Sequence, residues 1–321
     1  MKKKMVITGA AGELGLNIAR IMHDEGYAKK YDIVFLDRND VNLKILHKVF
    51  PQANSHRVDL SKKGGKDLEG SWEKFFEDAD VVLQLHAQIS STVKKDYSDS
   101  NIVSIRNVVD VCRKYKVKNL VHISSSVVIS VAKDDYTRTK KSGEEIVHRS
   151  KVPHTILRPT LMYGCFDIKH TGYLVSLVDN IPIFPMPGPG NYIRQPLFVE
   201  DFARIILKCA EMKPKNTIYN ITGKEQITVE EMIRAFFKER KMRRWIMHIP
   251  LWVFYLMIRT YQAINPKTRI VPDQLTALTA GDIFPVIDWE RIFGVRYTPF
   301  AQGVKKTVKS KYYMLYKEMK R

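Results

Sequence analysis

Residues 5–15, Met5-Val6-Ile7-Thr8-Gly9-Ala10-Ala11-Gly12-Glu13-Leu14-Gly15, carry the pattern that decides the fold of this chain. The stretch reads as a short apolar strand, a glycine-rich turn and the start of a helix. Gly9 allows a tight exit from the strand, Gly12 lets the backbone approach a phosphate group, and Gly15 lets the helix lie close to the sheet. The free N–H groups and the positive end of the helix dipole would then face that phosphate.

A second apolar strand, 32–36, ends in Asp37, twenty-two positions after Gly15. A dinucleotide-binding fold places here the carboxylate that accepts hydrogen bonds from the adenosine ribose. Glycines alone are a weak signal, because any strand–turn–helix unit can carry them. Glycine turn and carboxylate together predict dinucleotide binding rather than an ordinary βαβ unit. Asp37 would repel a 2′-phosphate and so favours NAD over NADP, whereas the neighbouring Arg38 argues the other way.

Apolar strands and amphipathic helices alternate from residue 5 to about 159. This alternation predicts an α/β fold of the Rossmann type, a doubly wound parallel sheet with helices on both faces. Further strands are expected at 55–58, 81–85, 120–123 and 155–157. One helix is expected to begin at about residue 14, another near Asn101, and a third to hold Tyr136.

After Pro159 the alternation breaks down, and prolines and glycines at 182–190 mark an irregular loop. A strand and a helix over 196–212 are expected to rejoin the sheet. We therefore divide the chain into an NAD-binding domain, 1–165 with 191–212, and a smaller C-terminal substrate-binding lobe, 166–190 and 213–321.

Lys and Arg number 53 against 34 Asp and Glu, which gives a net charge of +19. Such an excess suits an anionic partner. No nucleic-acid-binding motif is present, so a phosphorylated substrate or a membrane surface is favoured over DNA or RNA. The cysteines are widely spaced, which predicts no metal site and reduced thiols in a cytoplasmic protein. Lys2–Lys4 before an apolar run imitate a signal peptide, but Glu13 and Asn17 interrupt that run, so we expect no export.

Tyr136 and Lys140 form a Y-x-x-x-K pair. Positions i and i+4 share one helix face, so the phenol and the ammonium can act on one site. The cation is expected to lower the pKa of Tyr136 from about 10 toward neutral pH, which would make the phenolate a usable base. Ser126, at the end of a predicted strand, could orient a substrate hydroxyl beside it. The alternative is that both residues lie on the surface of an ordinary charged helix.

With these motifs the chain resembles an extended short-chain dehydrogenase/reductase of the NAD-dependent epimerase/dehydratase type over nearly its whole length. The segments Arg158–Gly164, Phe198–Asp201 and Ile287–Gly294 also fit that family. The resemblance implies NAD as cofactor and no metal. It makes Ser126, Tyr136 and Lys140 the catalytic set. The implied NAD-binding residues, from the phosphate turn and adenine side to the nicotinamide, are Gly9, Gly12, Glu13, Leu14, Gly15, Asp37, Arg38, Asp59, Leu60, Leu85, His86, Ala87, Ser124, Tyr136, Lys140 and Tyr163.

The reaction expected from the resemblance is a sugar 4-epimerisation. Dehydratases of the family carry an Asp-Glu pair directly after the catalytic Ser or Thr, whereas Val127 and Val128 follow Ser126 here. Tyr136 would take a proton from a sugar hydroxyl while hydride passes to NAD, and the hydride would return to the other face. Two alternatives stay open: an NAD(P)-dependent dehydrogenase or reductase of a hydrophobic alcohol or ketone, of the hydroxysteroid or flavonol type, and a non-enzymatic dinucleotide-binding subunit.

Arg194 aligns with an arginine that holds the substrate diphosphate in sugar-nucleotide epimerases of the family. With Ser126 it forms the expected substrate-binding pair, the alternative being a solvated loop arginine. Leu161 replaces an asparagine that contacts the nucleotide part of the substrate in those relatives. The substitution weakens the case for a UDP-linked sugar and leaves a diphosphate-linked one intact.

Residues 245–258 form an apolar stretch without Asp, Glu, Lys or Arg, and basic residues flank it on both sides. It is too short to cross a membrane, which takes about twenty residues. Trp and Tyr next to clustered cations are typical of a segment at an anionic membrane surface, such as the inner face of the cell membrane. The stretch resembles that of polyprenyl-diphosphate-linked N-acetylhexosamine 4-epimerases, and the alternative is a helix that only packs the small lobe. The sequence leaves open whether the chain forms a homodimer.

Overall fold

A computed structural model describes residues 2–62, 71–130, 134–168, 182–265, 275, 278–279, 281 and 283–319. Its centre is a seven-stranded sheet in the order β11-β6-β5-β4-β1-β2-β3, in which every neighbouring pair is parallel. The strands are β1 Lys3–Thr8, β2 Tyr31–Asp37, β3 Asn54–Arg57, β4 Ala79–Gln84, β5 Asn119–Ile123, β6 His154–Pro159 and β11 Thr217–Ile221. The doubly wound parallel sheet predicted from the sequence is confirmed.

The central strands read as continuous apolar runs because both of their faces are buried. In β1, Met5 and Ile7 belong to one apolar cluster, and Val6 between them belongs to another on the opposite face. Strand β1 lies between β4 and β2, so the glycine turn that follows it emerges at the middle of the sheet.

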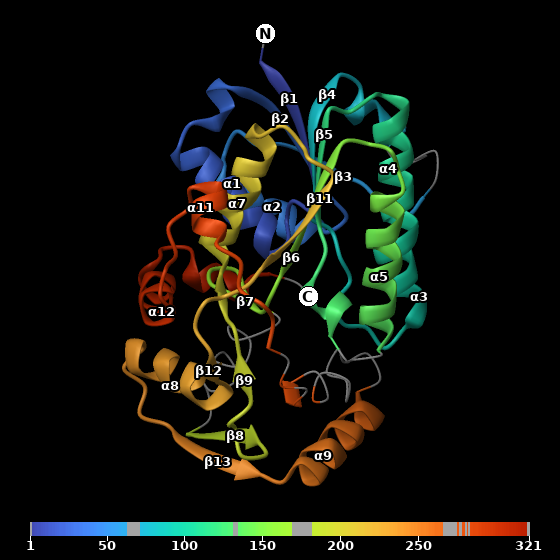
Figure 1. The fold of residues 1–321 in the computed structure, drawn as a ribbon. Helices are drawn as coiled ribbons and strands as arrows, with labels where there is room; N and C mark the ends of the chain where they lie inside the picture. The colour runs from blue at the N-terminus through green and yellow to red at the C-terminus, as the bar shows by residue number, and fades with distance from the viewer. Residues whose placement is uncertain are drawn as a thin grey trace.

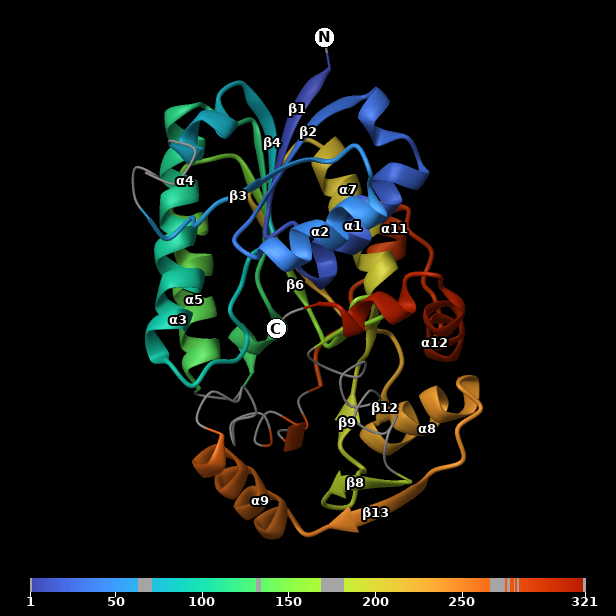
Figure 2. The same cartoon turned by 180° about the vertical axis from the view of Figure 1, so that it is seen from behind.

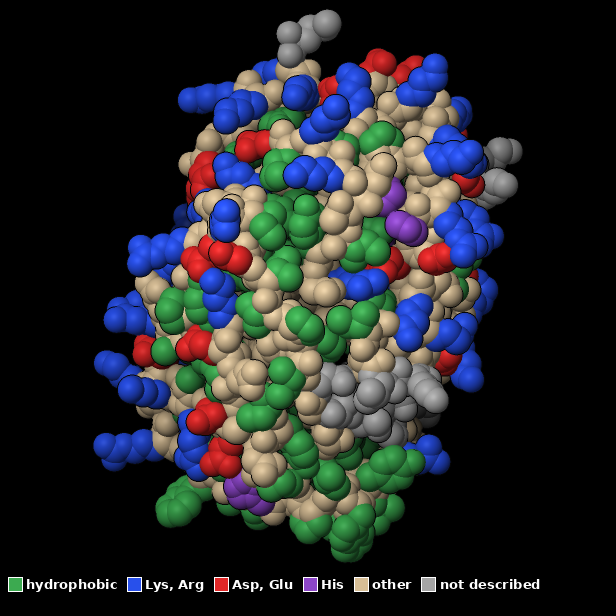
Figure 3. All heavy atoms as spheres, in the orientation of Figure 1, with side chains coloured by type: hydrophobic (Ala, Val, Ile, Leu, Met, Phe, Trp, Pro, Cys, Tyr) green, Lys and Arg blue, Asp and Glu red, His purple; other side chains and the backbone are tan. Residues whose placement is uncertain are grey.

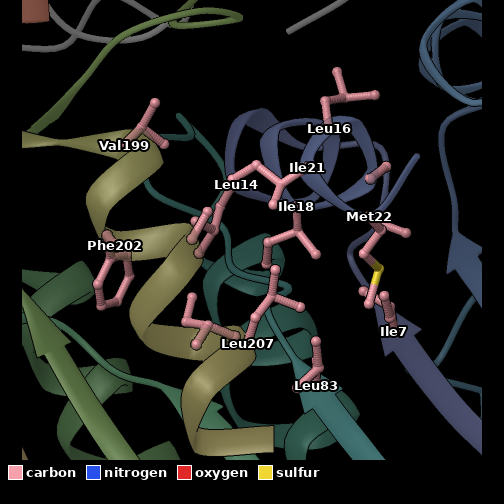
Figure 4. Close-up of a cluster of buried hydrophobic side chains, with 14 of the residues drawn as sticks. Ile7, Leu14, Leu16, Ile18, Ile21, Met22, Leu83, Val199, Phe202 and Leu207 are labelled. Atoms are coloured by element: carbon pink, nitrogen blue, oxygen red, sulfur yellow. The ribbon is translucent and has the colours of Figure 1, made fainter. Parts of the chain in front are cut away.

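Helices cover both faces of this sheet (Figures 1 and 2). The first layer holds α1 Glu13–Asp24, α2 Asp40–Val49 and α7 Val199–Glu211, and the second holds α3 Lys94–Ser98, α4 Ser104–Lys114 and α5 Asp135–His148. Figure 4 shows Leu14 and Ile18 of α1 packed between α7 and Leu83 of β4. Arg20 of α1 also pairs with Glu200 of α7 at 2.5 Å. Short turns of helix lie at Tyr27–Lys29, Trp72–Phe76, Ser126–Ile129 and Tyr313–Lys317.

The helix expected to begin near Asn101 begins earlier, at Lys94. A π-helical turn, Asp99–Val103, joins α3 to α4 and holds Asn101 in its middle. The prediction was wrong because α3 is a polar segment in which only Tyr97 is buried, so it lacks the apolar periodicity that marks a helix.

The segment 196–212 was predicted to return a strand and a helix to the sheet, and the strand part was wrong. Strand β10, Leu197–Phe198, pairs with β7, Met162–Tyr163, in a separate two-stranded sheet. The returning strand is β11, which pairs with β6 along its whole length. Its residues had been assigned to the small lobe, so the central sheet reaches further along the chain than 212.

The remaining elements gather at the carboxyl ends of the sheet strands, in the lower half of Figure 1. They are β8 Ile183–Pro187, β9 Ile193–Arg194, β12 Ile227–Thr228, α8 Val229–Glu239, β13 Trp245–Ile249, α9 Leu251–Ile264 and α12 Phe300–Lys309. Helix α11, Trp289–Phe293, packs instead on α7 in the first helical layer. A third apolar cluster joins β8, α8 and α12. Strand β13 pairs in parallel with β8, and β12 pairs antiparallel with β9. Among the described residues, no helix is long and apolar enough to span a bilayer.

Candidate functional site

A cavity of about 1490 Å³ lies between the carboxyl ends of the sheet strands and the small-lobe elements. One wall consists of the residues that follow β1, β2, β4, β5 and β6, and the opposite wall comes from β8, α8 and α9. Open α/β sheets bind their ligands at this edge, where the connections diverge to opposite faces. The cavity is therefore where a cofactor and a substrate would meet.

The three glycines of the first turn have different physical reasons to be glycine. Gly9 has a φ of +70°, and a Cβ there would lie 2.6 Å from the backbone of His86. A Cβ at Gly15 would collide with the backbone of Ala10. Gly12, by contrast, lines the cavity, and a Cβ there would come no closer than 3.4 Å to any described atom, the carbonyl oxygen of Gly9. The protein itself does not need a glycine at 12, so the space fits a ligand phosphate.

Asp37 lies at the end of β2, on the cavity wall, where the sequence predicted the ribose-binding carboxylate. Its Oδ2 accepts the Ala11 N–H at 2.9 Å, and its Oδ1 accepts the Asn39 N–H at 2.9 Å. Burial raises the pKa of Asp37, and the two N–H groups partly offset that rise. The neighbouring Arg38 donates from Nη2 to Oε1 of Gln88 at 2.9 Å. The carboxylate is thus fixed in orientation beside the phosphate turn, as an adenosine ribose would need.

Tyr136 and Lys140 both line the cavity, from the first and second turns of α5. Lys140 is almost wholly buried, and its Nζ donates to the carbonyl oxygen of Ile123 at 2.8 Å. Burial lowers the pKa of Lys140 to about 8, against the opposing effect of the Glu144 carboxylate. An ammonium with this pKa is still mostly protonated at neutral pH. The helix therefore brings a phenol and a buried cation to one site, as predicted.

The predicted lowering of the Tyr136 pKa was wrong for the protein alone. Burial raises the pKa of Tyr136 to about 12, and the Asp134 carboxylate acts in the same direction. The Lys140 ammonium donates its hydrogen bond to the carbonyl oxygen of Ile123, at the end of β5. It does not reverse the rise in the Tyr136 pKa that burial causes. The group that lowers the pKa is the hydroxyl of Ser125, which hydrogen bonds to the phenol.

Ser124, Ser125 and Ser126 all line the cavity where β5 ends, so the predicted Ser126 does lie at the site. Ser126 begins a short 3₁₀ turn and is buried. Sequence reasoning missed Ser125, because a run of three serines does not show which hydroxyl turns toward α5. The contact with Tyr136 adds Ser125 to the candidate residues.

The other expected cofactor residues lie mostly along the same wall. The cavity lining includes, from the predicted set, Glu13, Leu14, Asp59, Leu60, Leu85, His86 and Ala87. Nδ1 of His86 is 2.8 Å from the hydroxyl of Thr8, and burial lowers the pKa of His86 to about 3, so the ring is neutral. Gly15 lies behind the wall, where it permits the close approach of α1.

Tyr163 is, besides Gly15, a predicted cofactor residue that does not lie on the cavity wall. Its ring packs against Phe198 and Phe300, and its hydroxyl donates to the carbonyl oxygen of Phe300 at 3.3 Å. The wall at this point is formed by 159–162 instead. Tyr163 therefore holds the third apolar cluster together, and a contact of this region with a cofactor would come from the residues before it.

Arg194 lies on the cavity wall, on β9, as the substrate-binding prediction requires. Its Nη1 donates to the carbonyl oxygen of Ile193 at 2.8 Å, and its Nη2 donates to that of Leu278. The guanidinium is thus held by backbone carbonyls at the side of the cavity opposite the glycine turn. Within the described residues, no group of His, Cys, Asp or Glu is arranged to hold a metal ion.

Comparison with known proteins identifies the class to which this fold and site belong. Residues 5–222 match the NAD-dependent epimerase/dehydratase family, and the chain belongs to that family. The predicted family, the enzymatic nature of the chain and NAD as its cofactor are thereby confirmed. Gly12, Asp37 and Lys140 all line the cavity described above.

Individual relatives carry several activities. The chain is 28% identical over 250 residues to a putative UDP-glucose 4-epimerase of Methanocaldococcus jannaschii. The aligned region covers 69% of this chain and 77% of that protein. It is 23% identical over 234 residues, 66% of this chain and 69% of the other, to the N-acetyl-α-D-glucosaminyl-diphospho-ditrans,octacis-undecaprenol 4-epimerase of Escherichia coli O157:H7. Over 278 residues it is 24% identical to 3β-hydroxysteroid-dehydrogenase/decarboxylase isoform 2 of Arabidopsis thaliana, covering 74% of this chain and 49% of that protein.

Solved structures show the same fold. A UDP-glucuronic acid 4-epimerase from Bacillus cereus in complex with NAD superposes with a TM-score of 0.71 at 19% identity, covering 99% of this chain and 97% of that one. MoeE5 in complex with UDP-glucose and NAD gives a TM-score of 0.72 at 16% identity, with 95% and 97% covered. At these identities the likeness concerns the fold alone.

Proposed function

We propose that this protein is an NAD-dependent 4-epimerase of a diphosphate-linked hexose or N-acetylhexosamine. The observation that carries the proposal is the meeting of Tyr136, Lys140 and the serines after β5 in one cavity with the glycine turn. Arg194 on the opposite wall supplies a cation for the substrate diphosphate. Relatives named as 4-epimerases of sugar nucleotides and of a lipid-linked sugar support this reaction.

The chain's own residues would bind the substrate, orient it and move one proton. Bound NAD supplies the chemistry of accepting a hydride and giving it back. The Tyr136 oxygen takes the proton of the sugar hydroxyl as its carbon is oxidised and returns it when the carbon is reduced. Ser125 donates a hydrogen bond that favours the phenolate, and Lys140 keeps a positive charge on the same helix face.

The residues after the serines favour epimerisation over dehydration. Elimination of water needs an additional acid and base at the sugar. Val127 lines the cavity next to Ser126, and Val128 is buried, so neither position supplies a carboxyl group. These two positions therefore offer no additional acid or base for elimination, which favours epimerisation over dehydration.

The carrier of the sugar is the open part of the proposal. Leu161 lines the cavity where an amide would recognise a nucleotide, and Phe254 and Ile258 of α9 add an apolar side to the cavity. These residues favour a lipid diphosphate over UDP. Incubation with UDP-GlcNAc, UDP-glucose and polyprenyl-diphosphate-GlcNAc, followed by release and identification of the sugars, tests both carriers. We expect the galacto epimer to form without net NADH, and the absence of any epimer from all three substrates would reject the function.

A dehydrogenase of a hydrophobic alcohol is the second candidate, because the cavity is apolar at its α9 side and one relative is named a hydroxysteroid dehydrogenase. Such an enzyme would reduce one added NAD for every substrate molecule oxidised. An epimerase returns its hydride and shows no net absorbance change. Steady accumulation of NADH with a sterol substrate would therefore replace the first candidate with the second.

A further inference from the structure

The surface of β13 and α9 exposes large apolar side chains that the fold does not bury. Of the fourteen residues of α9, only Ile258 is buried. Trp245, Trp252 and Ile264 are 80%, 73% and 79% exposed. We name as the β13–α9 face the following six exposed residues: Trp245, Trp252, Tyr255, Leu256, Tyr261 and Ile264. In Figure 3 apolar side chains gather along the lower end of the molecule, where these elements lie. Large apolar side chains left exposed together in this way mark an interaction site.

The charges near this face are mainly basic, although Glu230 of α8 lies 3.3 Å from His248 of β13. The sequence has no Asp or Glu between Glu239 and Asp273. Arg240, Lys241, Arg243 and Arg244 come just before β13, and Arg259 lies on α9. Lys241, Arg243 and Arg259 are exposed. An apolar face whose neighbours in sequence are basic complements an anionic surface.

The residue types indicate a lipid bilayer. Trp and Tyr concentrate at membrane–water interfaces, where the ring is apolar and its N–H or O–H stays hydrated. Four of the six residues of the β13–α9 face are Trp or Tyr. Helix α9 is about 21 Å long at 1.5 Å per residue, so it can lie in the headgroup region but cannot cross the hydrocarbon core.

A second copy of the chain fits this face less well than a bilayer. A two-fold contact would bring the same patch of both copies together, and with it both basic borders. Like charges at close range oppose that contact, whereas anionic lipid headgroups neutralise them.

We propose that the β13–α9 face docks on an anionic lipid bilayer. The two sides of α9 then have two environments: Phe254 and Ile258 line the cavity, while Trp252 and Leu256 enter the headgroup region. Tyr261 is half exposed and also lines the cavity, so it lies at the border between the two. Docking holds the α9 side of the cavity against the membrane surface.

Flotation of the full-length protein with vesicles tests the proposal. We expect the wild type to float with phosphatidylcholine vesicles that contain phosphatidylglycerol, and salt to weaken that binding. The double variant Trp252→Glu/Leu256→Glu should lower the ratio of bound to free protein at least about tenfold, because burying one large apolar side chain is worth more than a factor of ten. Neither residue lines the cavity.

The matched control is the double variant Val93→Glu/Met212→Glu, which changes the net charge equally at exposed apolar residues elsewhere. It should float like the wild type, and stabilisation by NAD should show that both variants are folded. Equal flotation of all three proteins, or a wild type that stays in solution, would overturn the proposal. A wild-type dimer in light scattering that becomes monomeric in the Trp252→Glu/Leu256→Glu variant, without vesicle binding, would assign the face to a second copy instead. The assay requires no turnover, so its outcome is independent of the proposed epimerase activity.

Discussion

Gly12 and Gly15 are three positions apart in one turn, yet the chain needs them for different reasons. Gly15 is required by the fold, because any side chain there meets the Ala10 backbone. Gly12 is open toward the cavity and is free of such a collision. At the residue scale, this difference separates folding from cofactor binding within a single motif.

Gly12→Ala is expected to leave the free energy of unfolding nearly unchanged and to weaken NAD binding more than about tenfold, because the added methyl group occupies phosphate space. Gly15→Ala should instead cost about 1–3 kcal/mol of stability through overpacking. Denaturant unfolding and NAD titration of both variants measure the contrast. A Gly12→Ala protein that binds NAD as tightly as the wild type would show that the phosphates lie elsewhere.

Tyr136→Phe should lower turnover by about 10²–10⁴-fold, because the variant cannot accept the substrate proton. NAD binding should persist, since the ring remains in place. Tyr27→Phe is the control: Tyr27 lies in a short 3₁₀ turn outside the cavity, and its variant should keep full activity. Activity of Tyr136→Phe within a factor of two of the wild type would remove the proposed base.

Lys140 gives stability a pH dependence that can be measured without substrate. Its pKa is about 8 in the folded protein and about 10.5 in the unfolded chain. Between these values the unfolded chain binds more protons, so stability rises with pH. Below pH 8 the buried ammonium lowers the free energy of unfolding by on the order of 3 kcal/mol, and this loss of stability disappears toward pH 10. In the cofactor-free protein, wild type should gain stability relative to Lys140→Met from pH 8 to pH 10. If the free energies of unfolding of the two proteins changed with pH in parallel, the burial of this charge would be contradicted.

At the scale of elements, the π-helical turn 99–103 connects the second helical layer to the cavity. Asn101 in this turn accepts the Gln88 N–H and donates to the Gln88 carbonyl oxygen, both at 2.9 Å, and it also donates to Thr139 of α5 at 3.1 Å. One side chain therefore fixes the loop after β4, which lines the cavity, against two helices.

Asn101→Ala should cost about 2 kcal/mol of stability or more, because two buried backbone groups of Gln88 lose their partner. Catalysis should fall as well, since the loop carrying His86 loses its support. Asn54→Ala, at an exposed position of β3, is the control and should change stability little. Unfolding curves of both variants measure the difference, and equal stabilities would mean that the turn is held by other contacts.

The elements show why sequence reasoning succeeded in some places and failed in others. The phosphate turn and Asp37 were predictable because residues close in sequence make the whole unit. The position of Tyr163 depends on Phe300, which is far along the chain, and β11 depends on its partner β6. The choice between Ser125 and Ser126 depends on the backbone exit from β5, which a run of serines does not encode. No periodicity distinguishes the exposed side of α9 from a buried one, because both are apolar.

At the scale of the whole molecule, the Rossmann-type sheet and the small lobe are interleaved in sequence. Strands β8 and β9 precede α7 and β11, which complete the sheet and one helical layer, and the chain then returns to the lobe. A fragment of residues 1–165 would lack α7, which packs against α1 (Figure 4). We expect this fragment to aggregate or to lack cooperative unfolding in calorimetry. A soluble, cooperatively folded fragment would show that the sheet closes without α7.

The interleaving of sheet and lobe limits how specificity could be transplanted. Grafting a different sugar pocket onto this NAD-binding frame would require exchange at several junctions at once, on both sides of α7 and β11. A simple swap of carboxy-terminal halves would separate Arg194 from α8 and α9, with which it shares the cavity. New substrates are therefore easier to reach by local substitutions on the lobe than by recombination of whole halves.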